Sequence, residues 1–161
     1  MKKANTVQKA ARILAPIKTV DLKLEIDMRD GRYTNDICIL ITMLLSNNQK
    51  VQQVVLWLPA NYIDDDGVIF MFEELQHLVE LRKLTINLEW NFDISNRTVE
   101  SICRLLDHLP NLEYLSLRIK KNTYVNKAGD QQLIDKVKHI RTLSNFIYDG
   151  VSINHPYKGF K

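Results

Sequence analysis

Apolar and polar residues alternate in short segments that recur along the chain at a nearly fixed interval. Segments 81–88 (LRKLTINL) and 112–119 (LEYLSLRI) share the pattern L-x-x-L-x-[IL]-x-[LI], and their starts are separated by 31 positions (112 − 81). An apolar residue at every second place is typical of a β-strand, in which successive side chains point to opposite faces. A strand pattern that recurs at this interval indicates a solenoid of stacked repeats.

Further copies of the pattern lie on both sides of this pair. Three segments fit it, at 17–26 (IKTVDLKLEI), 51–58 (VQQVVLWL) and 143–148 (LSNFIY). The intervals between successive starts are 34 (51 − 17), 30 (81 − 51) and 31 (143 − 112). The stretches between the strands have helical periodicity instead, at 34–46, 65–78, 96–109 and 128–140. The repeated unit is therefore strand, loop, helix, loop, which predicts an α/β solenoid with a parallel concave sheet and helices on the convex side.

On these residues the chain resembles a leucine-rich-repeat protein of the ribonuclease-inhibitor-like kind, with one strand and one helix per repeat. The resemblance covers residues 17–154 and implies a short horseshoe that binds partners on its concave sheet. Repeats of that family usually carry Asn or Cys at the positions that Glu89 and Lys120 occupy here. The ladder of asparagines that turns the chain after each strand is therefore expected to be missing.

A single domain is expected for 161 residues. Four hydrophobic residues near the start, Val7, Ala10, Ala11 and Leu14, form one helical stripe that would cover the open edge of the first repeat. The long first interval is attributed to an extended loop at 27–35. The predicted division is a capping helix at 1–16, repeats at 17–50, 51–80, 81–111 and 112–142, and a partial repeat with a C-terminal cap at 143–161.

Composition narrows the class of protein and the cellular compartment that the sequence predicts. The net charge of +3 is too small to argue for nucleic acid, and no apolar run approaches the roughly 20 residues that span a bilayer. Cys38 and Cys103 lie in helical segments two repeats apart, so they are expected to be buried thiols rather than a disulfide. This favours a reducing, cytoplasmic setting. Residues 1–20 are basic and free of acids, which leaves open an organelle-targeting segment, and a secreted microbial effector is another possibility.

No catalytic or metal-binding motif is present in the sequence, so neither an enzyme nor a cofactor is expected. The sequence Asp64-Asp65-Asp66-Gly67 lacks the alternation of a calcium loop and is interpreted as a helix N-cap. Three histidines recur at a constant interval of 31 (108 − 77, 139 − 108): His77, His108 and His139. Stacked helices would hold them roughly 10 Å apart, too far for one zinc ion with bonds of about 2 Å.

Strand alternation predicts which side chains face the concave side. Trp57 is expected to be exposed at the centre of this face as a binding anchor. Glu89 and Lys120 are expected to pair across adjacent strands, and the charge is expected to change from acidic to basic along the face. The three predicted columns are Lys23, Val55, Thr85, Ser116; then Glu25, Trp57, Asn87, Arg118; then Asp27, Pro59, Glu89, Lys120.

These observations favour a non-catalytic scaffold or adaptor that binds a protein partner. A substrate-recognition-type subunit or a microbial effector is a more specific version. A subunit associated with nucleic acid or ribonucleoprotein, using Arg118, Lys120, Lys121 and Lys127, is the alternative from another class, and nucleic acid is the less favoured partner. The predicted protein-binding residues are Glu25, Trp57, Asn87, Glu89, Arg118 and Lys120.

Overall fold

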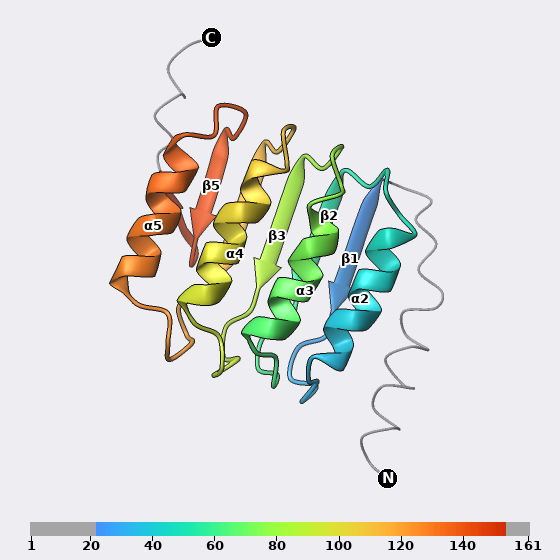
Figure 1. Ribbon diagram of the computed structural model, residues 1–161, viewed down its shortest axis with the longest axis vertical. Coiled ribbons are helices and arrows are strands. Elements are labelled where there is room, and N and C mark those ends of the chain that lie inside the picture. Colours follow the sequence, from blue (N-terminus) through green and yellow to red (C-terminus); the bar gives the residue numbers. More distant parts are fainter. Residues whose placement is uncertain (1–21, 154–161) are drawn as a thin grey trace.

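The computed structural model describes residues 22–153, which fold into strand–helix repeats placed side by side (Figure 1). One six-stranded sheet runs in chain order from β1 to β6, and the helices pack on one of its faces. The strands are β1 (Lys23–Asp27), β2 (Gln53–Trp57), β3 (Lys83–Asn87), β4 (Tyr114–Arg118), β5 (Asn145–Tyr148) and β6 (Val151–Ile153). The helices are α2 (Asp36–Ser46), α3 (Asp65–Leu75), α4 (Asn96–Asp107) and α5 (Lys127–Lys138).

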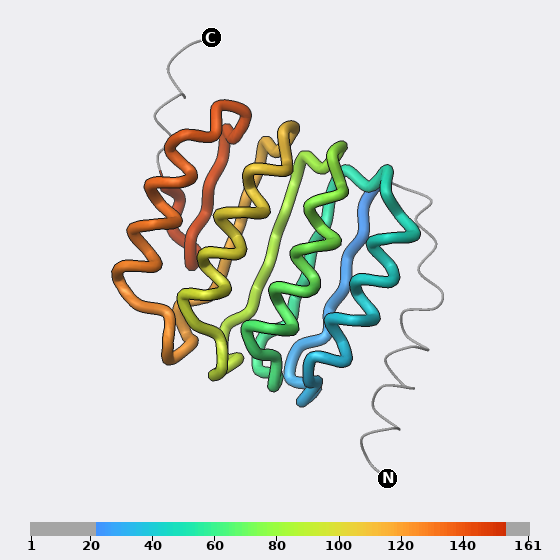
Figure 2. The backbone as a smooth tube through the Cα atoms, viewed as in Figure 1, coloured from blue at the N-terminus to red at the C-terminus, as the bar shows by residue number. Residues whose placement is uncertain are grey.

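The alternation of the sequence becomes the two faces of a parallel sheet. Strands β1 to β5 pair in parallel, and only β6 runs antiparallel to its neighbour β5. Each turn of the chain lies beside the previous one (Figure 2). The apolar positions point toward the helices, and one register row of them is Leu24, Val54, Leu84, Leu115 and Phe146, all buried. The predicted α/β repeats with a parallel sheet are confirmed. The predicted caps at 1–16 and in the tail lie outside the described residues.

The predicted alignment of the first strand is wrong. Lys23 pairs with Gln53, which gives an interval of 30 (53 − 23) between the first two repeats instead of 34. Leu24, Ile26 and Met28 supply the core positions, and all three are buried. Alternation in the sequence continues upstream of this strand, and a shift by an even number of residues leaves the apolar set on the same face. The period of two therefore identifies the face of this strand without identifying its register.

A buried ladder of three asparagines turns the chain after β2, β3 and β4, contrary to the expectation that the ladder is missing. Asn61, Asn91 and Asn122 are at most 3% exposed. The Nδ2 of Asn91 donates to Leu88 O in its own repeat and to Leu58 O in the preceding one, both at 2.9 Å. The family pattern would place the ladder at Glu89 and Lys120. The observed asparagines, Asn91 and Asn122, lie two residues further along the chain.

The oxygen side of the ladder joins successive repeats. Asn122 Oδ1 accepts from the backbone N–H of Asn91 at 2.8 Å, and Asn91 Oδ1 accepts from that of Ile63 at 3.2 Å. The buried backbone groups in the turns that follow the strands need such hydrogen-bond partners, because an unpaired buried donor costs about 1–3 kcal/mol. The register puts Gly31 at the corresponding place in the first described repeat, and its N–H donates to Asn61 Oδ1.

A second buried polar contact joins two helix starts. Asp65, in the first turn of α3, accepts four hydrogen bonds from the N–H and hydroxyl groups of Ser95 and Thr98 at the start of α4. Burial alone would raise the pKa of Asp65, but these hydrogen bonds outweigh it and hold that pKa below its ordinary value of 3.8. The acidic residues predicted as an N-cap thus include the cap itself, since Asp64 accepts from Gly67 N–H, and a contact between repeats.

We expect Asn91→Leu to lower the free energy of unfolding by about 2–4 kcal/mol, because it leaves the buried N–H of Ile63 without its side-chain acceptor. Urea denaturation measures this. The matched control is Asn111→Leu, since exposed Asn111 makes one comparable bond to Val79 O; its loss should stay below about 1 kcal/mol. Equal losses in the two variants would contradict the structural importance of the ladder.

We expect the stability contributed by Asp65 to disappear in acid. Because its folded-state pKa is depressed, this contribution is complete above an unfolded-state pKa of about 4 and is lost as pH falls through the folded-state value. The difference in unfolding free energy between the wild type and Asp65→Asn should therefore be about 1–3 kcal/mol at pH 7 and shrink below pH 4. A difference that is constant across this range would show that the charge is not involved.

Candidate functional site

The face of the sheet opposite the described helices, here called the open sheet face, carries the predicted binding residues. The true register changes their neighbours. Glu25 pairs with Val55, whereas Asp27 takes the place beside Trp57 that was expected for Glu25. The row that contains Trp57 is Asp27, Trp57, Asn87 and Arg118.

Trp57 is half-buried rather than fully exposed. The guanidinium of Arg29 lies over its ring, 5.5 Å from the centroid. Arg29 in turn donates from Nε and a terminal nitrogen to the two carboxylate oxygens of Asp27, at 2.8 and 2.7 Å. This fork holds the pKa of Asp27 below its usual value. The indole is thus part of an acid–guanidinium–aromatic cluster in the first two repeats.

Asn87 is buried and holds a neighbouring side chain in place. Its Oδ1 accepts from the N–H of Glu89 at 2.9 Å, and its Nδ2 donates to Glu89 Oε2 at 3.3 Å. Glu89 lies 3.7 Å from Arg118, and Lys120 lies 3.9 Å from Asp149. The predicted pair of Glu89 and Lys120 is therefore wrong, because each side chain has a nearer partner at the end of an adjacent strand.

These residues lie along the ends of strands β1 to β5. Bases are paired with acids at both ends, Arg29 with Asp27 and Lys120 with Asp149, so the expected change from acidic to basic is largely cancelled locally. Lys120 also lies over the ring of Tyr148, 4.8 Å from its centroid. We call the following residues the strand-end row: Asp27, Arg29, Trp57, Glu89, Arg118 and Lys120.

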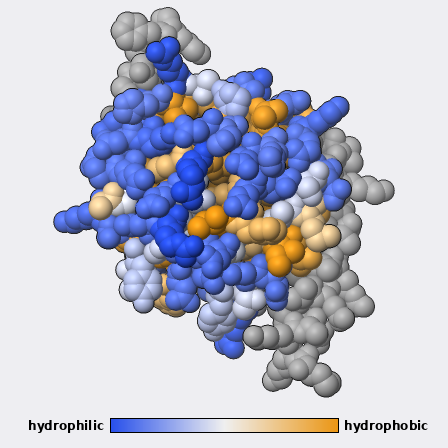
Figure 3. Space-filling view, viewed as in Figure 1, coloured by the Kyte–Doolittle hydropathy of each residue, from blue (hydrophilic) through white to orange (hydrophobic). Residues whose placement is uncertain are grey.

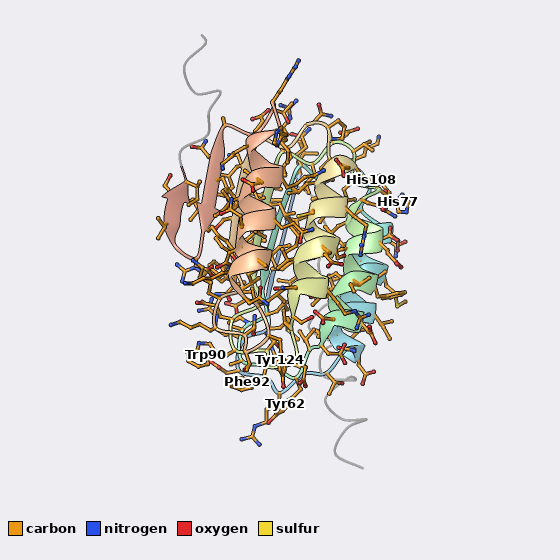
Figure 4. All side chains as sticks on the ribbon, turned by 60° about the vertical axis from the view of Figure 1, so that its left-hand side comes forward. Tyr62, His77, Trp90, Phe92, His108 and Tyr124 are labelled. Carbon is orange, nitrogen blue, oxygen red and sulfur yellow. The ribbon has the colours of Figure 1, made fainter. Side chains whose placement is uncertain are left out.

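A cluster of exposed aromatic side chains lies in the loops just beyond the strand ends, and it is not among the binding residues that strand alternation predicts. Figure 4 shows these aromatics at one end of the molecule, away from His77 and His108. Their exposed fractions run from 49% to 61%, for Tyr62, Trp90, Phe92 and Tyr124. The signal that predicts this cluster is the position of each aromatic within two residues of a ladder asparagine, once the ladder is placed correctly.

The helical face, formed by the described helices on the other side of the sheet, has a surface depression. A groove of about 600 Å³ runs between α3 and α4, with Phe70 and Leu105 among charged and polar residues that include His77 and His108. Apolar side chains also gather on this face over α2 and α3 (Figure 3), where Ile39 and Met43 are exposed. Within residues 22–153, no three His, Cys, Asp or Glu side chains are arranged to hold a metal ion.

The two cysteines are not placed to react at the open sheet face or at the helical face. Cys38 and Cys103 are buried and free. Burial raises the pKa of Cys38 to about 12, so its sulfur remains a protonated thiol at neutral pH. No helix in the described part of the chain is long and apolar enough to cross a membrane.

Comparison with known proteins supports the class of fold. No protein-family model matches the chain, and no curated protein gives a significant match. Among solved structures, the chain is similar to "Leiomodin-1 Actin-Binding Site 2 (ABS2)", with a TM-score of 0.61 and 20% identity, over 89% of this chain and 77% of that one. At this identity the likeness shows the fold alone, which is an α/β arrangement of repeated strand–helix units with a parallel sheet.

Proposed function

We propose that this chain is a non-catalytic protein-binding adaptor, a short leucine-rich-repeat-like horseshoe whose open sheet face binds a protein partner. The observation that carries the proposal is the strand-end row, in which an indole and several charged groups share one side of the sheet. The similar leiomodin domain is named as an actin-binding site, which supports a protein as the class of partner here.

The strand-end row has the composition of a binding surface. Trp57 is a residue type that often dominates binding energy, and its indole is held by Arg29 before any partner arrives. The ion pair of Asp27 and Arg29 is about half exposed, so it contributes little to folding and can exchange for a partner's charges at small cost. Arg118 is likewise more exposed than the largely covered Glu89 beside it. Alternating acids and bases would then fix the partner's orientation and register.

A protein fits this row better than a nucleic acid does. Arg118 and Lys120 each face a carboxylate, which lowers the positive field that a phosphate backbone requires. The two buried thiols fit a reducing compartment, and we propose a cytoplasmic location on that ground. A substrate-recognition subunit or a microbial effector would use the same face.

We expect the double variant Trp57→Ala/Arg118→Glu to lose the protein partners that the wild type captures from a lysate of its own cells, because the anchor and one ion-pair partner are removed together. Affinity capture followed by mass spectrometry measures this. Exposed Arg118 and half-buried Trp57 leave the core intact, so circular dichroism should match the wild type.

The matched control is Phe70→Ala/Arg104→Glu, which makes the same kinds of change on the helical face. It should retain the partners that the sheet variant loses. Retention of all partners by the sheet variant, or equal loss in both variants, would place the binding site elsewhere. A partner that proves to be RNA or DNA, with steep salt dependence, would favour the alternative class.

A further inference from the structure

The ladder asparagines place two rows of side chains at the rim beyond the strands. Every repeat contributes one residue immediately before the ladder position and one immediately after it. The row before the ladder is Asp30, Ala60, Trp90 and Lys121, and the row after it is Arg32, Tyr62, Phe92 and Thr123.

A groove of about 440 Å³ crosses the first three of these repeats. The methyl group of Ala60 is the smallest side chain in its row, and the larger Asp30 and Trp90 stand on either side of it. Tyr62 and Phe92 add aromatic surface from the other row, and Arg32 completes the lining. The groove therefore exists because a small residue lies between large ones at equivalent positions of adjacent repeats.

Trp90 occupies a backbone conformation that disfavours its side chain. Its φ is 64°, in the left-handed region that Gly or Asn adopts at lower cost. Its indole is also 49% exposed, so burial in the core does not account for it. A bulky aromatic that the local fold neither requires nor favours is a reason to look for a binding role.

The rings of the groove are oriented to receive a ligand. Trp90 and Phe92 meet edge to face, with centroids 6.3 Å apart and planes at 75°, so they present two nearly perpendicular surfaces. Lys121 Nζ lies 5.8 Å from the centroid of Trp90 and supports the indole from the next repeat. The indole N–H, the hydroxyl of Tyr62 and the guanidinium of Arg32 supply hydrogen-bond donors around the same groove.

We propose that this groove binds a proline-rich peptide in the polyproline II conformation. Proline rings pack into grooves between aromatic side chains, and the polyproline II backbone keeps its carbonyl oxygens free of internal hydrogen bonds. Those carbonyls match the donors of the groove. The ligand loses little conformational entropy because its bound conformation exists before binding.

The charges of the groove favour a peptide over a nucleic acid strand or an anionic membrane. Asp30 and Arg32 contribute one charge of each sign, and neither forms an ion pair or a side-chain hydrogen bond with any other residue in the described part of the chain. Stacked bases or acidic lipids would need an excess of positive charge. Asp30 is instead available for a basic residue that flanks the prolines.

The probe is a fluorescein-labelled peptide of ten prolines followed by one arginine, and its affinity is measured by fluorescence polarisation. We expect saturable binding by the wild type with a dissociation constant of about 10–500 µM, as for other small interfaces. A Gly-Ser peptide of the same length and charge should not bind. Substitution Trp90→Gly should weaken binding at least tenfold.

The stability of the variants makes this test decisive. Because Gly suits the left-handed backbone, Trp90→Gly should unfold at a temperature equal to or above that of the wild type, so lost binding cannot come from misfolding. Tyr124→Ala is the matched control, since Tyr124 is similarly exposed at the same edge but does not line the groove, and it should bind normally.

Three results would overturn the proposal: no binding of the proline peptide up to 2 mM, about four times the weakest affinity expected; equal affinity of wild type and Trp90→Gly; or tighter binding of oligo(dT) or phosphatidylserine vesicles at this groove. The variant Trp57→Ala/Arg118→Glu should bind the peptide as the wild type does. Its result separates the groove from the open sheet face, so either site can fail without the other.

Discussion

The rest of the structure depends on the hydrogen bonds of the buried asparagines at the ends of the parallel strands. A parallel sheet delivers every strand end to the same edge, and each chain must turn there with its polar backbone buried. Asn91 satisfies carbonyls of two repeats with one amide nitrogen and an N–H with its oxygen. One side chain thus closes its own turn and fixes the distance to the preceding repeat.

This constraint connects the core to both candidate surfaces. Because the ladder residues point inward, their neighbours in the chain are held at the rim, where Trp90 and Phe92 project on either side of Asn91. Just before the turn, the side chains of the strand-end row lie on the face of the sheet opposite the helices. The two surfaces therefore belong to adjacent parts of each repeat. The two proposals together describe an adaptor that holds a folded protein on the sheet and a short peptide at the rim.

The repeats and their order could be predicted from the sequence, because the period-two pattern of the strands and the helical periodicity between them do not depend on the exact residue at any one position. The register of β1 could not, since Val20 and Leu22 extend the alternation upstream and an even shift keeps the same face buried. The family pattern predicts the ladder at Glu89 and Lys120, although the sequence shows Asn61, Asn91 and Asn122 recurring two residues beyond that position. Alternation also predicts the direction in which the Trp57 side chain points, but not the stacking of Arg29 that half-buries it. The positive φ of Trp90 recurs at the equivalent residues Asp30 and Ala60, so it belongs to the repeated turn, and the alternation of apolar residues does not reveal it.

Native-state hydrogen exchange of the loop amides that hydrogen-bond to the ladder would test this account most directly. The N–H groups of Gly31, Tyr33, Ile63 and Asn91 lie outside the strands yet donate to ladder oxygens. If the ladder holds the repeats together, the amides of Ile63 and Asn91 exchange only through the global unfolding that also exposes β2, β3 and β4. Exchange of these two amides at the rate of open surface loops, with the strands still protected, would contradict the account.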